Sequence, residues 1–389
     1  MKLKALAAAA LAATTLVVGA GAAHATSPEP SGWDDVLDNI KGGGSDTTYN
    51  IMQKIGILYN QGTGCEQNTA FVAGNPTTAG SYGNCLVPTN NQTDTKGNWD
   101  HDGTFEEYPT GSSAGVKELL AGTVDYARSS RGPNATGESG TNFWAIGKDA
   151  LAIITWGNRA PGNLTKAQLQ GIYNCTITTW DQITGDPADA SQVIEPVGMN
   201  SSSGTYASFK SFLGFEPNAG ACVKKLDDPD GAGPQTAIFP FENDLKPVIA
   251  QSGINDNNAI WWMSWANFRA FSFKRQTAVS WTIDSKTLSA ANVSNNTWPA
   301  TRFIFHVTKS ADAAPDAATD NVLGGDTGKP GAVREFTEFI CKVAANHSVN
   351  EGSGLSNYDE LTKAYSDTGF LRVPSTERTN GICRVVPAP

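Results

Sequence analysis

The chain has 389 residues, a formal net charge of −10, and a composition of 39% hydrophobic and 17% charged residues. The acidic balance argues against nucleic acid as a partner, because binding to phosphate backbones needs clustered Lys and Arg. A site for any anion must therefore work through local hydrogen bonds and dipoles rather than through overall charge. Beyond the first 25 residues there is no apolar run of roughly eighteen residues, so the sequence predicts no membrane span there.

The first 25 residues have the pattern of a secretory signal peptide. Lys2 and Lys4 precede an alanine-rich apolar run over residues 5–23, and Ala23-His24-Ala25 is a small-x-small cleavage site. Cleavage near Ala25 removes two of the 28 basic residues, so the formal charge becomes −12. No cysteine near the new N-terminus offers a site for a lipid, and we expect a secreted protein, extracellular or periplasmic. A membrane anchor is the alternative interpretation.

The rest of the chain, roughly 360 residues, exceeds what one hydrophobic core usually supports, so we predict two lobes. Helical patterns alternate with short apolar runs, which favours an α/β fold. We predict helices over residues 116–121, 166–173, 206–213 and 333–345, and strands over 151–156, 193–197 and 303–307. The first and last of these strands are expected to cross between the lobes. The expected division is a linker at 26–44, a discontinuous first lobe at 45–152 and 304–389, and a second lobe at 153–303.

Six cysteines lie far apart, without the Cys-x-x-Cys spacing of zinc or redox motifs. In an exported chain they indicate three disulfides. Fifteen pairings are formally possible. We predict pairing between sequential neighbours, because each such bond closes a modest loop: Cys65 with Cys85, Cys175 with Cys222, and Cys341 with Cys383.

Three segments combine glycine with hydroxyl residues and run directly into a predicted helix. They are residues 44–48, 111–115 and 201–205. Each would place the N–H groups of a first helical turn beside Ser or Thr hydroxyls, which is an arrangement that binds oxyanions. For any one segment, N-capping of the helix is the simpler interpretation. Three together favour a shared site for a tetrahedral oxyanion.

Residues 111–133 resemble the second ligand loop, helix and following strand of the phosphate-binding proteins that serve ABC importers. Residues 196–205 resemble their Ser-Gly-Thr loop, residues 163–181 their second-lobe helix and Trp-Asp turn, and residues 44–48 their first loop. The resemblance implies a two-lobed periplasmic-binding-protein type II fold that closes on phosphate or a similar oxyanion, an ABC permease as partner, a monomer, and neither catalysis nor cofactor.

The same resemblance, with the substitutes discussed next, gives the candidate ligand-binding residues Ser45, Asp46, Thr47, Ser112, Ser113, Ser129, Ser130, Arg131, Ser203, Gly204 and Thr205. Three positions depart from the family. Members typically have an acid where this chain has Ser130, and an Arg and an Asp where it has Met199 and Ser201. Which oxyanion binds is therefore left open. Asp46 could replace the acid and Arg128 or Arg131 the cation. Alternatively, Asp46 caps a helix and both arginines are solvated.

Two other functions compete with this interpretation. Residues 111–115 match the Gly-x-Ser-x-Gly elbow of serine hydrolases, with Ser112 or Ser113 as nucleophile and His101, His306 and His347 available. The residues before the elbow do not form the buried strand that it needs, so a secreted esterase or phosphatase is second choice.

Trp261, Trp262 and Trp265 could bind a cell-surface glycan, but their spacing favours one buried face of a helix.

Asn98, Asp100, Asp102 and Gly103 imitate the start of a calcium-binding loop, but the twelfth position of that loop is Pro109 rather than Glu, so we predict no metal.

Overall fold

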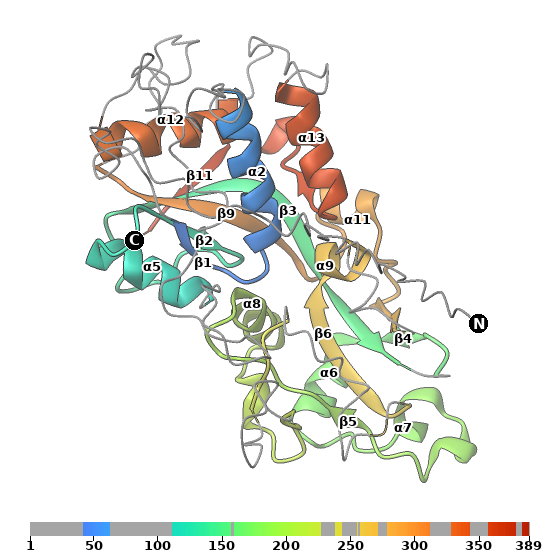
Figure 1. Ribbon diagram of the computed structural model, residues 1–389. Helices are drawn as coiled ribbons and strands as arrows, with labels where there is room; N and C mark the ends of the chain where they lie inside the picture. Colours follow the sequence, from blue (N-terminus) through green and yellow to red (C-terminus); the bar gives the residue numbers. More distant parts are fainter. Residues whose placement is uncertain are drawn as a thin grey trace, which may run out of the picture.

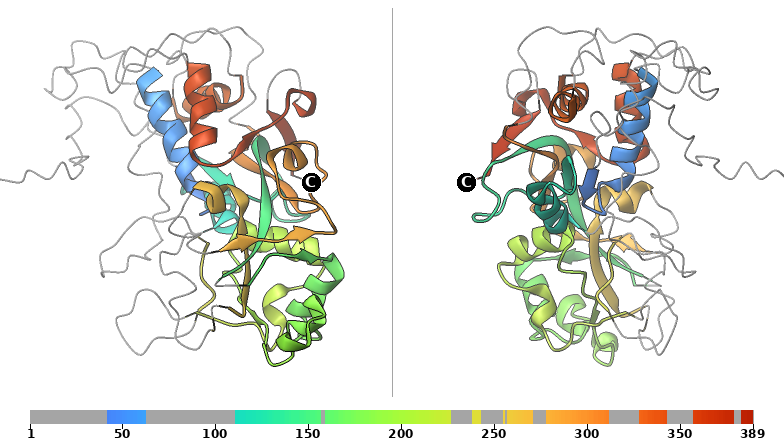
Figure 2. Two further views of the ribbon diagram at one scale, coloured as in Figure 1. Left: turned by 90° about the vertical axis from the view of Figure 1, so that its right-hand side faces the viewer. Right: turned by 60° about the vertical axis from the view of Figure 1, so that its left-hand side comes forward.

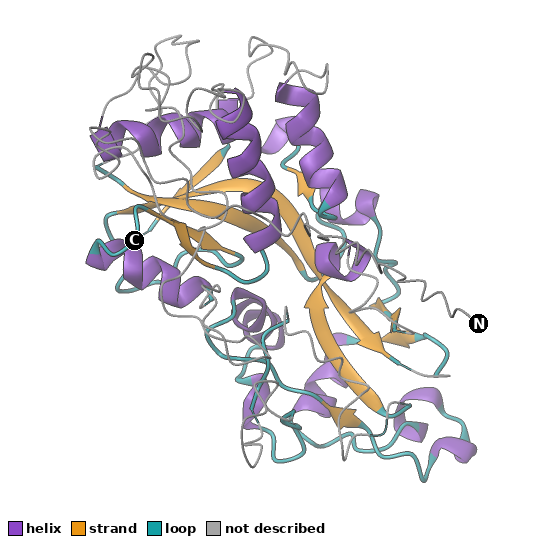
Figure 3. Cartoon of the chain, viewed as in Figure 1, coloured by secondary structure: helices purple, strands orange, loops and turns teal. Residues whose placement is uncertain are grey.

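The computed structural model describes residues 42–62, 111–156, 159–226, 238–242, 255, 257–270, 278–311, 328–342, 357–378 and 383–388. The signal peptide with its cleavage site, the linker up to residue 41, the Cys65–Cys85 pair, His101, His347 and the calcium-like residues lie outside this part of the chain. The described residues form a mixed α/β fold in which helices flank a twisted sheet (Figures 1 and 3).

Lobe one is the half of the molecule built on the first part of the long strand β3 (Thr141–Thr155). Its strand order is β1-β2-β9-β3, formed by β1 (Gly42–Gly44), β2 (Tyr126–Ser129) and β9 (Thr301–Lys309). The short strands β10 (Leu371–Arg372) and β11 (Arg384–Pro387) pair antiparallel with β3. Because β9 pairs with residues 141–150 of β3, it is anchored wholly in lobe one.

Helices cover both faces of this sheet. α2 (Tyr49–Gly62), α12 (Gly328–Lys342) and α13 (Asn357–Asp367) lie on one face, and α5 (Ser112–Ala121) lies on the other (Figure 1). α2 and α13 lie side by side although they come from opposite ends of the chain (Figure 2). Alternate residues of β3 supply the two cores, with Trp144 and Ile146 on the α2 face and Phe143 and Ala145 on the α5 face.

Lobe two begins where β3 changes partners. From Leu151 onward β3 pairs with β6 (Ala259–Ser264) and β7 (Val279–Ser280), and β5 (Glu195–Pro196) pairs parallel with β6. The other elements are β4 (Asn163–Leu164), β8 (Thr282–Ile283), α6 (Lys166–Tyr173), α7 (Asp181–Thr184), α8 (Gly204–Leu213), α9 (Trp265–Ala270) and α11 (Ala290–Ser294). Among the described residues, short 3-10 helices cover Pro187–Asp189 and Pro217–Ala219 in lobe two, and Ser375–Glu377 after β10 in lobe one.

The structure confirms most of the predicted elements and corrects three details. The four predicted helices correspond to α5, α6, α8 and α12, and the three predicted strands to β3, β5 and β9. Among the described strands β3 pairs in both lobes, whereas β9, which was also expected to cross, pairs with lobe-one strands alone. Residues 42–44 are not linker but the buried strand β1, which glycine permits by letting Tyr126 lie directly against Gly42. Trp261 and Trp262 lie on strand β6 rather than on a helix.

Burial decides the role of these tryptophans. Trp261, Trp262 and Trp265 all lie in the core of lobe two, where the Trp262 ring stacks on Phe209 at 4.2 Å between ring centroids. They therefore present no exposed face on which a sugar could stack.

Two of the predicted disulfides are present. Cys175–Cys222 lies in lobe two, and Cys341–Cys383 ties α12 to the residue before β11. Among the described helices, none is both long enough and apolar enough to cross a membrane.

Candidate functional site

The three glycine and hydroxyl segments meet at the boundary between the lobes. The first lies between β1 and α2, the second opens α5, and the third opens α8. Seven of their side chains are buried, those of Ser45, Asp46, Thr47, Thr48, Ser112, Ser203 and Thr205, as is that of Ser130, which follows β2. We call six of these hydroxyl-bearing residues the hydroxyl cluster: Ser45, Thr47, Ser112, Ser130, Ser203 and Thr205. Asp46 is buried beside them.

Ser130 lies at the centre of the cluster. Its backbone N–H donates to Ser112 Oγ at 3.0 Å, and its own Oγ donates to Thr47 Oγ1 at 3.3 Å. Ser45 Oγ donates to Ser130 Oγ at 3.1 Å. Ser45 and Thr47 precede α2, Ser112 opens α5, and Ser130 directly follows β2. Three separate segments of lobe one therefore meet at Ser130.

Lobe two reaches the cluster through the start of α8. Thr205 Oγ1 shares a hydrogen bond with Thr47 Oγ1 at 2.8 Å, and Ser203 Oγ donates to Asp46 Oδ1 at 3.3 Å. Both contacts join residues of opposite lobes. The lobes are therefore in contact at the hydroxyl cluster itself.

Two glycines make this approach possible. An ideal Cβ at Gly204 would lie 2.3 Å from both Ser112 Oγ and Ser130 Oγ, and one at Gly111 would lie 2.1 Å from the carbonyl oxygen of Ser202. Gly111 also has a φ of 96°, a value that side-chain-bearing residues rarely adopt. The absence of a side chain at Gly111 and Gly204 thus allows the close approach of one lobe to the other.

The local geometry suits an oxyanion. Ser203 caps α8 by accepting a hydrogen bond from Thr205 N at 3.2 Å, and Gly111 precedes α5 without a side-chain cap. The first turns of α2, α5 and α8 all begin at the cluster. Helix N-termini carry outward N–H groups and the positive end of the helix dipole, so hydroxyls and amides together can surround an anion.

The structure does not bring every predicted residue into the cluster. Ser129 forms a local turn, in which its Oγ donates to Arg131 O at 2.8 Å. Ser113 is exposed and accepts a hydrogen bond from Arg131 Nε at 3.2 Å. Arg131 itself forms an ion pair with Glu138, so its guanidinium is held away from the cluster by a nearer carboxylate.

The other departures from the family pattern have a structural explanation. Met199 is buried in the core of lobe two, where its apolar side chain fits the surroundings, and Ser201 is exposed. Arg128 is buried, but its Nη1 donates to Gly42 O at 3.3 Å and its guanidinium lies 5.5 Å from the Tyr49 ring centroid. Arg128 and Arg131 are both buried, so the alternative interpretation in which both are solvated is wrong.

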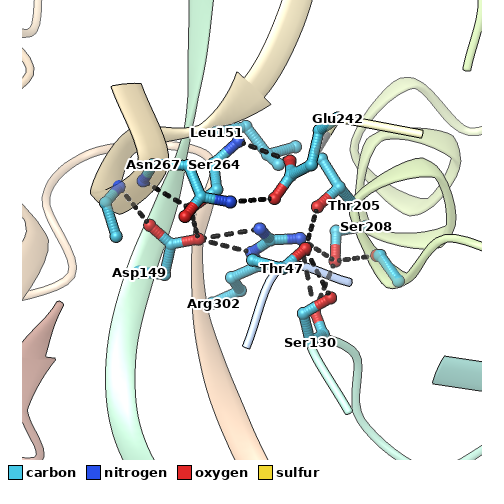
Figure 4. A network of polar contacts seen from close by, with 12 residues as sticks. Thr47, Ser130, Asp149, Leu151, Thr205, Ser208, Glu242, Ser264, Asn267 and Arg302 are labelled. Atoms are coloured by element: carbon cyan, nitrogen blue, oxygen red, sulfur yellow. Dashed lines mark hydrogen bonds and ion pairs between the residues drawn. The ribbon is translucent and has the colours of Figure 1, made fainter. Parts of the chain in front are cut away.

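A third arginine, which the sequence analysis did not select, lies next to the cluster. Arg302 on β9 reaches Ser130 O and Ser208 Oγ with its Nη1, while its other nitrogens contact Asp149 on β3 (Figure 4). The one sequence signal that could have identified Arg302 is its position as a charged residue directly before the apolar run 303–307. Nothing in the sequence, however, pairs Arg302 with an aspartate 153 positions earlier.

The arrangement does not support a catalytic triad at Ser112. His306 lies in β9, where its Nε2 pairs with Thr337 Oγ1 at 3.0 Å and its ring packs against Tyr126 and Phe336. Ser112 Oγ instead accepts from the Ser130 backbone N–H. Among the residues that the structure describes, no group of three or more His, Cys, Asp or Glu side chains could hold a metal ion.

Comparison with known proteins places the chain in a family. A family model described as the PBP superfamily domain matches residues 29–341, and the chain belongs to this superfamily. Its fold is the two-lobed periplasmic-binding-protein type II fold. Comparison with curated protein sequences finds no match.

Two solved structures illustrate the fold. An ABC-type phosphate transport receptor from Vibrio cholerae has a TM-score of 0.50 and 19% identity, covering 86% of this chain and 99% of the receptor. A structure from Clostridium perfringens, described as a phosphate ABC transporter substrate-binding protein with bound phosphate, has a TM-score of 0.51 and 18% identity, covering 86% of this chain and 100% of the other.

Proposed function

We propose that this protein is an exported solute-binding protein that holds inorganic phosphate, or a similar tetrahedral oxyanion, at the hydroxyl cluster and delivers it to an ABC permease. The observation that carries the proposal is the convergence of three helix N-termini and six buried hydroxyls from both lobes on one point. The superfamily supports it, as do the two similar structures, whose descriptions name phosphate transport.

Binding exchanges hydroxyl contacts for contacts to the anion. Thr47, Ser130 and Thr205 now hydrogen-bond to one another, and each hydroxyl can rotate its proton toward an oxyanion oxygen instead. The lobes must part to admit the ligand and close again around it, which removes water from the charged groups. No chemical step is required of any residue in the cluster.

Asp46 supplies the selectivity in this proposal. It is buried at the cluster and accepts a hydrogen bond from Ser203 across the lobe boundary. A carboxylate is only an acceptor, so it favours an oxyanion that still carries a proton, such as phosphate or arsenate. The same carboxylate repels fully ionised sulfate.

The test is calorimetric titration of the phosphate-stripped mature protein with phosphate, sulfate, arsenate and molybdate at pH 7. We expect phosphate to bind, and Thr205→Val to weaken binding by about ten- to a hundredfold, because it removes one hydrogen bond to a charged group. Ser211→Ala, an exposed position on the same helix, is the matched control and should bind like the wild type. Absence of binding to all four anions would refute the proposal.

A further inference from the structure

A buried ion pair lies where the two lobes join. Arg302 and Asp149 are direct cross-strand partners on β9 and β3, with 2.7 Å between Arg302 Nη2 and Asp149 Oδ2. Their side chains are 7% and 0% exposed. Asp149 is fixed further by β6 and α9, because its Oδ2 accepts from Ser264 Oγ at 2.7 Å (Figure 4) and its Oδ1 accepts from the Ala266 N–H at 3.0 Å. The ion pair with Asp149 therefore fixes the position of the Arg302 guanidinium.

The remaining nitrogen of Arg302 points toward the hydroxyl cluster. Nη1 donates to Ser130 O at 3.3 Å and to Ser208 Oγ at 3.4 Å. Ser208 lies one turn into α8, and its Oγ contacts both Ser130 O at 3.1 Å and Gly204 O at 2.9 Å. One arginine thus contacts the lobe-one residue at the centre of the cluster and the lobe-two helix that closes on it.

We propose that Arg302 is a positioning residue that, through Ser208, fastens α8 to Ser130 and so stabilises the closed form of the cleft. Its contacts with Ser130 and Ser208 belong to different lobes and can exist together only when the lobes are closed. An interaction made in one conformation and lost in the other shifts the equilibrium toward the first. The expected effect is on ligand release, because dissociation requires opening. The inference rests on the proposed function for its ligand.

The contacts of Arg302 with Ser130 and Ser208 lie beside an open cavity, so water can reach them. This cavity has a volume of about 310 Å³ and is lined in part by Lys166, Ser208, Ser211, Phe212 and Arg302. Substitutions at Ser208 or Arg302 therefore open onto an existing cavity and do not leave a sealed void. This makes folded variants attainable.

The experiment measures the dissociation rate of radiolabelled inorganic phosphate after dilution into unlabelled phosphate. Ser208→Ala removes the contact of Arg302 to α8 and the contact of Ser208 Oγ to Ser130 O, and it leaves the Arg302–Asp149 pair intact. We expect dissociation to become about tenfold faster or more, because a hydrogen bond to a charged donor and the Ser208–Ser130 contact are both lost, and the association rate to stay within about twofold. Arg302→Lys keeps the charge but not the forked geometry, so it should also accelerate release. Ser211→Ala is again the control.

A second readout does not depend on the ligand. The radius of gyration in solution, measured by small-angle scattering without phosphate, should be larger for Ser208→Ala than for the wild type, because the lobes open more often. If the wild type binds phosphate and neither variant changes the dissociation rate, the proposed role of Arg302 is wrong and the proposed function stands. If the wild type binds none of the four anions and scattering still shows opening, the proposed function alone is wrong. Unchanged scattering with no binding refutes both.

Discussion

Asp46 and Ser130 show how the identity of single residues sets the chemistry of the site. The hydroxyl of Ser130 both donates to Thr47 and accepts from Ser45. The neighbouring carboxylate in this chain is Asp46, on a different segment, and it accepts a hydrogen bond from Ser203 of lobe two. In the proposed function Asp46 is the acceptor that the resemblance would place at Ser130.

Replacing Asp46 should relax selectivity rather than abolish binding. In Asp46→Asn the side chain is neutral and its amide can donate a hydrogen bond, so sulfate no longer meets a carboxylate that repels it. We expect the ratio of phosphate to sulfate affinity to fall by about tenfold or more, measured by calorimetric titration with both anions. An unchanged ratio, with both affinities intact, would show that Asp46 serves only to hold Ser203.

His306 makes the stability of lobe one depend on pH. Complete burial lowers the pKa of His306 to about 3, whereas the unfolded chain titrates near its ordinary value of about 6.5. The unfolded state therefore takes up a proton first. The stability that the folded state gains from keeping His306 neutral is fully present above pH 6.5 and is lost as the pH falls toward 3.

We accordingly expect the free energy of unfolding to drop between pH 7 and pH 5 by about 2 kcal/mol more in the wild type than in His306→Gln, which cannot titrate. Urea denaturation at both pH values measures this difference. An equal drop in the two proteins would mean that other groups dominate acid sensitivity.

At the scale of elements, α8 is the part of lobe two that meets lobe one, and its first residue leaves no room for a side chain. The two hydroxyl oxygens that a Cβ at Gly204 would approach belong to α5 and to the end of β2. Gly204→Ala should therefore obstruct closure while leaving the helix itself intact, because alanine favours a helix more than glycine does.

We expect Gly204→Ala to lower phosphate affinity at least tenfold with no loss of melting temperature, as determined by titration and by thermal denaturation. Retained affinity would mean that the first turn of α8 shifts to accommodate the methyl group. The closed form would then tolerate a larger separation between the lobes.

At the scale of the whole molecule, the net negative charge opposes the capture of an anion. The mature chain is expected to carry a formal charge of −12, since two lysines leave with the signal peptide. Repulsion at long range is screened by salt, with a Debye length of about 30 Å at 0.01 M ionic strength and about 8 Å at 0.15 M. The association rate for phosphate should therefore rise with salt over this range, measured by rapid mixing. A fall would indicate that a local positive field from the helix N-termini at the hydroxyl cluster outweighs the net charge.

Much of the fold follows from patterns that the sequence displays locally. The helices α5, α6, α8 and α12 and the strands β3 and β9 were predictable, because the spacing of apolar residues reports which face an element buries. The disulfides Cys175–Cys222 and Cys341–Cys383 followed from the preference for short loops. The glycine and hydroxyl composition of three loops was enough to identify most of the cluster.

What the sequence by itself determined, then, is the class of fold, the elements and the loops that make the hydroxyl cluster. Only the tertiary structure decided which charged groups accompany that cluster. Arg131 was the nearer candidate in sequence, yet Glu138 neutralises it, while Arg302 reaches Ser130 from a strand that lies 172 positions later. The physical reason is that hydrophobic periodicity and capping act over a few residues. A buried charge, in contrast, is positioned by whichever partner the folded chain brings within hydrogen-bonding distance.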